Sequence, residues 1–361
     1  MKHEETKPWP QVLLEALRGA ALVLVVAMVL WVTAGPAAAA GIDARKGETM
    51  VIPMGRAVGI KLFSDGVIVV GMSDIATEQG AVNPARECGL KEGDIITHIN
   101  SEEVDSIEEV RSVLQDLEGE TMSIRALRGE KQVQMTAQGV QCSTDGSYKL
   151  GAWIRDSMAG IGTMTFYQPS TGTFGALGHG ISDIDTALLM PLEDGSIMYA
   201  EVAQVQKGVA GTPGQLQGAF EVSNDLGELW ANTNCGVFGT LTDESLLGDQ
   251  AAVPVASRDE VQTGAATILS NINGSEVKEY TIEITKIFAE SATDSRDFMI
   301  RVTDPELLQT TGGIVQGQSG SPILQNGKLI GAVTHVLVND PTSGYAISGE
   351  RMLSQAAQSG E

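Results

Sequence analysis

Basic residues, aromatic residues, cysteines and histidines are all scarce in this chain of 361 residues. It has 23 Lys and Arg against 46 Asp and Glu, which gives a formal net charge of −23. Such a surface repels nucleic acid and anionic lipid, so we expect no nucleic-acid partner, and the acidity mainly serves solubility. Aromatic residues make up only 4% of the chain, whereas there are 42 glycines. This composition predicts a mainly β fold with many tight turns, and the length is enough for two domains.

The few cysteines and histidines exclude a metal centre built on them. No pair among the three cysteines or the four histidines has the spacing of metal ligands. A single disulfide between Cys142 and Cys235 and a set of buried free thiols are both compatible with the spacing. We therefore expect no metal and no cofactor.

The N-terminal segment lacks charge over a long stretch. Residues 19–42 contain no charged side chain, and residues 20–32 are almost entirely apolar. A membrane-spanning helix needs roughly 20 apolar residues, and the basic residues that precede the stretch favour a cytoplasmic N-terminus. A retained anchor and a signal peptide cleaved after the small residues 37–39 stay open, and both export the rest of the chain. We assign residues 1–42 to a cytoplasmic tail and an anchor or signal segment with a hydrophobic helix, and residues 43–50 to a polar linker.

Residues 51–139 have the pattern of a small α+β domain. A short apolar strand is expected at 67–70 and a second at 95–99. Ser106 and Glu109 have capping-box spacing, at the start of a helix whose apolar residues recur every three or four positions until Gly119. Alternating residues at 121–127 and 133–137 then predict a hairpin.

This order of elements, with Gly-Leu-x-x-Gly-Asp-x-Ile at 89–96, resembles a PDZ domain. Such domains bind an extended peptide at a sheet edge and often hold its C-terminal carboxylate. The resemblance places the peptide-binding loop at residues 55–60, with Gly59 and Ile60 as the contacts. The alternative is a domain that only packs against the rest of the protein.

Residues 140–361 contain the strongest chemical signal, a serine in a glycine-rich turn. Ser319 lies in Gly-Gln-Ser-Gly-Ser-Pro at 317–322, which is typical of the nucleophile turn of trypsin-like proteases. An apolar strand is expected directly after it, at 329–333. His179, in Gly-His-Gly at 178–180, is the candidate base, and we expect the rival His335, inside an apolar strand, to pack or to shape the site.

A third residue should be a carboxylate that orients the histidine. Asp304 ends an alternating strand before a proline, which is a suitable place to fix a carboxylate. Asp183 and Asp185 near the histidine, and the more distant Asp243, stay as alternatives.

Several segments together resemble the SpoIVB peptidase family. They are residues 175–183 (GALGHGISD), 232–239 (NTNCGVFG), 311–322 (TGGIVQGQSGSP) and 331–345 (GAVTHVLVNDPTSGY). The order of anchor, PDZ-like domain and peptidase is also similar. The resemblance implies a trypsin-like double β-barrel over residues 140–361, with Ser319, His179 and Asp304 as the catalytic residues.

The same resemblance implies a role. The family serves endospore formation, and its members are exported from the forespore into the space between the two membranes. There they cleave a membrane-associated regulator of an intramembrane protease, which leads to processing of a late mother-cell sigma factor, and they also cleave their own N-terminal segment. The expected partners are therefore a protein substrate, that segment, and the membrane through residues 19–42.

The residues predict acyl transfer as the chemistry. His179 takes the proton of Ser319, and the backbone amides of Gly317 and Ser319 form the oxyanion hole. The competing interpretations are an HtrA-like quality-control protease, which has its PDZ domain after the protease, and a catalytically silent PDZ scaffold.

Overall fold

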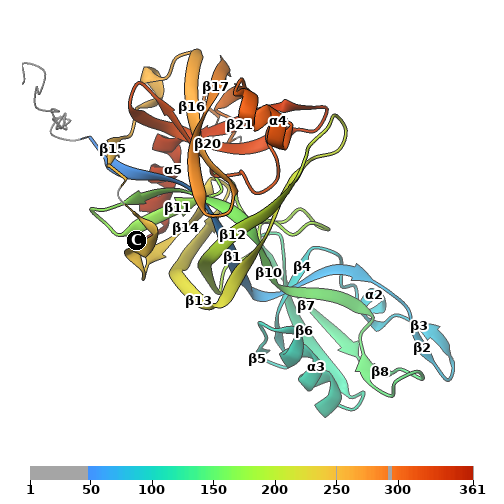
Figure 1. Cartoon of the computed structure of the whole chain (residues 1–361). Helices are drawn as coiled ribbons and strands as arrows, with labels where there is room; N and C mark the ends of the chain where they lie inside the picture. Colours follow the sequence, from blue (N-terminus) through green and yellow to red (C-terminus); the bar gives the residue numbers. More distant parts are fainter. Residues whose placement is uncertain (1–47, 249, 292–294, 361) are drawn as a thin grey trace, which may run out of the picture. The chain divides into compact units, whose positions relative to one another are not determined.

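The computed structural model describes residues 48–248, 250–291 and 295–360 (Figure 1). The predicted N-terminal tail, the hydrophobic segment 19–42 and most of the linker lie outside the described residues. Among the described residues, no helix is long and apolar enough to cross a membrane. The described part forms one compact unit, Glu48–Glu361.

The first barrel has six antiparallel strands. Their order in the sheet is β10-β11-β14-β13-β12-β1, and pairing between β1 and β10 closes the ring. Phe174, Met164 and Ile197 are fully buried in the core of this barrel. Phe166 and Phe238 are also fully buried, but they pack against apolar residues near the C-terminus such as Leu329 and Ile347. The strands are β1 (Met50–Met72), β10 (Ala152–Gln168), β11 (Thr173–Ala176), β12 (Asp194–Gln206), β13 (Gln215–Thr233) and β14 (Gly236–Leu241).

The second barrel is also closed by six antiparallel strands, in the order β16-β17-β18-β21-β20-β19. Ile268, Ile282, Phe298, Ile300 and Val333 are among its core residues. The short β15 (Val253–Pro254) pairs with β1. It is flanked in the sequence by two short 3₁₀ helices, η1 (Glu244–Leu246) and η2 (Arg258–Glu260). The other elements are β16 (Gly264–Asn273), β17 (Glu276–Ile287), β18 (Phe298–Val302), α4 (Pro305–Thr311), β19 (Pro322–Gln325), β20 (Lys328–Leu337), β21 (Asp340–Ser348) and α5 (Gly349–Ser359). Two six-stranded antiparallel barrels are the architecture expected of a trypsin-like protease.

A small module lies between β1 and β10 in the sequence, with its own core. The helix predicted after Ser106 is confirmed, and the capping box of Ser106 and Glu109 is formed. The predicted hairpin is confirmed as β6 and β7, which pair from Thr121↔Gln138 to Arg128↔Lys131. The elements are β2 (Ile75–Thr77), β3 (Gly80–Val82), α2 (Pro84–Glu87), β4 (Asp94–Ile99), β5 (Glu102–Glu103), α3 (Ile107–Asp116), β6 (Thr121–Arg128), β7 (Lys131–Gln138), β8 (Val140–Gln141) and β9 (Tyr148–Lys149).

The Gly-Asp pair of the module's sequence motif has a structural explanation. Gly93 has a positive φ of 86°, which glycine adopts without steric cost. The carboxylate of Asp94 is fully buried and accepts two 2.7 Å hydrogen bonds from Arg128 on β6. It also accepts the amide of Lys91. This ion pair closes the turn before β4 onto the neighbouring strand.

The predicted peptide-binding loop at 55–60 is wrong, because this segment is part of a strand. Gly59 and Ile60 lie in β1 and pair on one side with β10 (Gly59↔Ile161, Ile60↔Gly160) and on the other with β12. Both edges of the strand are therefore occupied at Gly59 and Ile60, and Phe220 packs so closely on Gly59 that a Cβ atom there would lie 2.6 Å from its own Cβ. The first half of β1 thus belongs to the barrel, although we assigned residues from 51 onward to the PDZ-like domain.

The three cysteines are free thiols. Cys142 is buried, and Cys88 and Cys235 are partly buried. The alternative of a Cys142–Cys235 disulfide is therefore not what the structure shows.

Candidate active site

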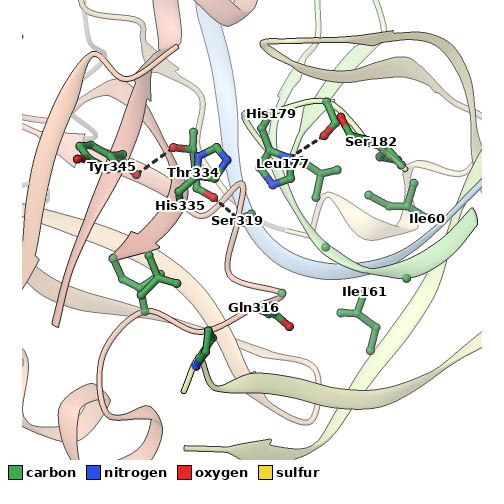
Figure 2. Close-up of a pocket in the computed structure, with 18 of the residues that line it drawn as sticks. Ile60, Ile161, Leu177, His179, Ser182, Gln316, Ser319, Thr334, His335 and Tyr345 are labelled. Carbon is green, nitrogen blue, oxygen red and sulfur yellow. Dashed lines mark hydrogen bonds between the residues drawn. The ribbon is translucent and has the colours of Figure 1, made fainter. Parts of the chain in front are cut away.

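Ser319 and His179 both line one cavity, which has a volume of about 980 Å³ (Figure 2). Its walls come from β1 and β10 of the first barrel, including Ile60 and Ile161, and from β20 of the second barrel, including His335. Side chains from segments 140 residues apart in the chain therefore meet at one site.

Both barrels hold the turn that carries Ser319. From the first barrel, Thr163 on β10 donates its amide to the carbonyl of Ser319 (3.1 Å) and its hydroxyl to the carbonyl of Gly317 (2.7 Å). From the second barrel, the carbonyl of Val333 accepts the amide of Gly320 (2.7 Å). A Cβ atom at Gly320 would lie 2.0 Å from the carbonyl oxygen of Thr163, so this contact between the barrels requires glycine.

Gln318 fixes the turn from inside. Its side chain is 1% exposed, and its amide oxygen accepts the backbone N–H of Val315 (2.9 Å). Its amide nitrogen donates to the hydroxyl of Ser270 on β16 (3.1 Å). Because both ends of the buried amide are satisfied, the residue before the serine cannot reorient without breaking two hydrogen bonds.

The hydroxyl of Ser319 donates a 2.7 Å hydrogen bond to the carbonyl of Thr334 on β20. Among the described residues, no hydrogen bond joins Ser319 to His179. The hydroxyl of Ser319 is therefore not bonded to its base, and its side chain has to rotate before His179 can take its proton. Catalytic hydrogen bonds are often formed only when substrate is bound.

His179 is held in the tautomer that a general base requires. Its Nδ1 lies 2.9 Å from the carbonyl oxygen of Gly180, which can only accept, so Nδ1 carries the proton and Nε2 of the neutral ring is left to accept one. Burial lowers the pKa of His179, and the Gly180 bond acts in the opposite direction. A lowered pKa keeps the ring neutral at pH 7, as a base must be.

His335 lies beside His179, with ring centroids 5.1 Å apart and planes tilted by 39°. It is exposed on β20 and lines the cavity, next to Thr334, the acceptor for Ser319. This agrees with the expectation that His335 shapes the site.

Asp304 is not brought to this cavity. Its carboxylate caps helix α4, where it accepts the amide of Leu307 (3.0 Å), and it also accepts the amide of Thr281 (3.3 Å). Its catalytic role stays a prediction, and its contacts are those of a helix cap.

The other carboxylates that we weighed also have partners elsewhere. Asp183 is fully buried and bonded to Arg155 and to Thr186, Asp185 pairs with the same arginine, and Asp243 caps η1. Among the described residues that line the cavity there is no Asp or Glu. Within this part of the chain, the group that orients His179 is a carbonyl.

The oxyanion hole at Gly317 and Ser319 stays a prediction. In the described structure neither amide donates to another protein group, so both are available to a developing oxyanion. Sequence reasoning missed Thr163, Thr334 and the carbonyl of Gly180. Gly180 and Thr334 lie in segments that the sequence singled out, but they act through backbone carbonyls, which no side-chain pattern reveals, and Thr163 acts through a contact between the barrels.

Comparison with known families decides the assignment. Residues 146–353, more than half of the chain, match the SpoIVB peptidase S55 family. The chain belongs to this family. Residues 81–128 match a PDZ domain. The SpoIVB-type chain is thus a serine endopeptidase with a PDZ domain, as its sequence predicted.

Solved structures resemble the chain more distantly. The active form of the Rv3671c protease from M. tuberculosis has 16% identity, with 70% of this chain and 85% of that chain covered and a TM-score of 0.32. The HtrA-type protease AlgW with a decapeptide has 12% identity, with 60% and 55% covered and a TM-score of 0.34. The PDZ domain of an SdrC-like protein from Listeria monocytogenes has 24% identity, with 25% and 87% covered and a TM-score of 0.20. No curated protein sequence matches this chain.

Proposed function

We propose that this serine endopeptidase serves endospore formation. It is exported from the forespore, held at the membrane through residues 19–42 or released from it, and acts in the space between the two membranes. There it cleaves a membrane-associated regulator of an intramembrane protease, so that a late mother-cell sigma factor is processed, and it also cleaves its own N-terminal segment. Membership of the SpoIVB family supports this role.

The observation that carries the chemistry is the shared cavity of Ser319 and His179. Nε2 of His179 is free to accept a proton, and the ring is neutral because burial lowers its pKa. Ser319 leaves the carbonyl of Thr334, transfers its proton to Nε2 and attacks the peptide carbonyl. The acyl-enzyme forms, the leaving amine takes the proton back from His179, and water then releases the acyl group by the same route.

The negatively charged oxygen of the tetrahedral intermediate accepts hydrogen bonds from the backbone amides of Gly317 and Ser319. Thr163 and Gln318 hold this turn before substrate arrives, so the amides need no reorganisation during the reaction. The hydroxyl of Ser319 has to leave the carbonyl of Thr334 before the reaction can begin.

A fluorophosphonate probe tests the chemistry, because it reacts only with an activated serine. We expect labelling of the wild type, loss of labelling in Ser319→Ala and His179→Ala, and normal labelling in Ser182→Ala. Ser182 is a second serine that lines the cavity, so it is the matched control. Labelling that survives Ser319→Ala would refute the assignment, and failure to label any variant would favour the silent scaffold.

The biological role needs a test in sporulating cells. Replacing the native gene with the Ser319→Ala variant should stop sigma-factor processing in the mother cell and leave vegetative growth at high temperature unchanged. Normal processing together with heat-sensitive growth would instead indicate a quality-control protease.

A further inference from the structure

Strand β10 has one unpaired edge over most of its length. On one side it pairs with β1 from Ala152↔Met72 to Tyr167↔Ile52. On the other side β11 covers only Met164–Gln168, and Thr163 contacts the turn at Ser319. Within the described structure, residues 153–162 have no strand on that second side. We call this stretch the β10 edge.

The β10 edge leads from the PDZ module to the catalytic cavity. At its near end, Met158, Gly160 and Gly162 line the cavity together with Ser319 and His179. At its far end, Ile154 packs against the core of the module. Figure 1 shows β1 and β10 continuing from the barrel into the module that contains β4, β6 and α3. From Trp153 to Ile161 the edge is roughly 26 Å long, at about 3.3 Å per residue.

Different elements flank the two faces of this edge. Successive side chains of a strand point to opposite faces. Arg155 forms ion pairs with Asp183 and Asp185 in the loop after the catalytic histidine. Asp156 accepts the amide of Ile107, the first residue of α3 (2.9 Å). The edge therefore lies between that loop and α3. These contacts are made by side chains, so they leave the backbone N–H and C=O groups on the side away from β1 unpaired.

The edge is also unobstructed near the catalytic cavity. Ala159 and Gly160 are exposed, and a Cβ atom at Gly160 would have no heavy atom within 4 Å. At the other end Trp153 is 63% exposed, although tryptophan is usually buried. Long unpaired edges are normally blocked, because they pair with any extended chain. An edge that stays open beside a protease cavity is suited to binding an extended polypeptide.

We propose that an extended segment of the substrate adds as a strand to the β10 edge, so that the module and the catalytic cavity share one continuous track. This rests on the proposed peptidase activity. The occupant is the stretch on one side of the scissile bond. It lacks proline, which cannot supply the ladder's N–H groups, and carries an apolar side chain about eight residues from that bond, opposite Trp153. PDZ domains bind peptides by the same strand addition, and here β10 is bonded to the first residue of α3 through Asp156.

A length series of peptides tests the proposal. An octapeptide that the protein cleaves is extended by four, eight or twelve residues, on one side or the other, with leucine at the eighth position. We expect KM to fall roughly tenfold for extension on one side. The fall should level off once that side reaches about eight residues from the scissile bond. Blocking single N–H groups of that extension by N-methylation should weaken binding at every second residue, because a strand pairs only alternate residues with its neighbour.

Variants assign the effect to the edge. Trp153→Ala should abolish most of the gain from extension and leave cleavage of the octapeptide unchanged, and Trp153→Phe should restore most of it. Leu127→Ala is the matched control. It removes another exposed apolar side chain of the module, but from β6, which is paired on both sides. Equal KM values for all lengths, or N-methyl effects without alternation, would overturn the proposal.

Binding separates this proposal from the peptidase activity. Fluorescence titration of Ser319→Ala with the long and short peptides reports occupation of the edge without turnover. Tighter binding of the long peptide together with no cleavage by the wild type would refute the peptidase and keep the track. Equal binding together with normal cleavage would refute only the track.

Discussion

Replacing Asp304 by Asn separates two roles that this residue has been given. As a catalytic carboxylate, Asp304 would orient His179 and stabilise its charged form. As a helix cap, it accepts the amide of Leu307 at the start of α4 and, more weakly, the amide of Thr281. Asn is nearly isosteric with Asp and is an equally good N-cap, but it cannot stabilise an imidazolium ion.

The two roles predict effects of very different size. Replacing a triad aspartate by Asn lowers kcat about 10⁴-fold, which corresponds to about 5.5 kcal/mol of transition-state stabilisation. Loss of an N-cap to Ala costs about 1 kcal/mol of stability, whereas Asn caps a helix as well as Asp does. From the contacts in the structure, we expect Asp304→Asn to retain kcat/KM within about threefold. We expect Asp304→Ala to lower Tm by about 2–4 °C with a similarly small effect on turnover.

The assay is fluorophosphonate labelling rate and peptide turnover, with Tm measured on the same samples. His179→Ala supplies the reference for loss of the base. A fall in kcat of three orders of magnitude or more for Asp304→Asn, at unchanged Tm, would refute the argument. It would mean that the active enzyme brings Asp304 to His179 after a movement of the segment before α4.

Three further predictions concern charge. Because burial lowers the pKa of His179, the acid limb of kcat/KM should have its midpoint below the usual value of about 6.5, and a pH profile with a midpoint above 7 would contradict this. Asp297 is fully buried between Arg258 and Arg351, so Asp297→Ala should lower the free energy of unfolding by about 3–5 kcal/mol in urea titrations. Burial raises the pKa of Asp183, but hydrogen bonds from Thr186 and Arg155 lower it by more, to below its usual value. A depressed pKa stabilises the fold above the unfolded value of about 3.9 and loses this effect as pH falls through the folded value. The stability difference between wild type and Asp183→Asn should therefore vanish in acid, and a constant difference from pH 6 to pH 2 would count against it.

Local signals in the sequence were sufficient where structure depends on neighbours in the chain. Helix α3 begins at a capping box and ends before Gly119, which has a positive φ of 85°. The hairpin of β6 and β7 follows from alternation and a short turn. The turn at Ser319 could be predicted because glycine is required on both sides of it. The Gly-His-Gly segment already indicated His179 as the base for Ser319, 140 residues away, and the family resemblance supported this pairing.

The sequence could not predict contacts that depend on distant partners. Residues 55–60 have the glycine and apolar residues of a peptide-binding loop, but pairing with β10 and β12 keeps them in a strand. Asp304 has the position of a catalytic carboxylate, and the proline that follows it also makes it a good N-cap. Nothing local distinguishes these alternatives, because the strands that pair with residues 55–60, and the histidine that Asp304 would have to reach, lie far away in the chain.

The shared strands also determine how the PDZ module can be removed. The module is an insertion between β1 and β10, and these two strands pair with each other and close the first barrel. Deleting residues 51–139 would remove β1 and expose the barrel core, so we expect that variant not to fold.

Phe63 and Ser157 are paired across the two strands. Replacing residues 64–156 by a two-residue Asn-Gly turn therefore keeps the barrel closed as a hairpin. We expect this variant to label with the fluorophosphonate probe and to cleave short peptides, while it loses the gain from long ones. An unfolded product, judged by circular dichroism, would mean that the barrel depends on the module's core as well as on its own.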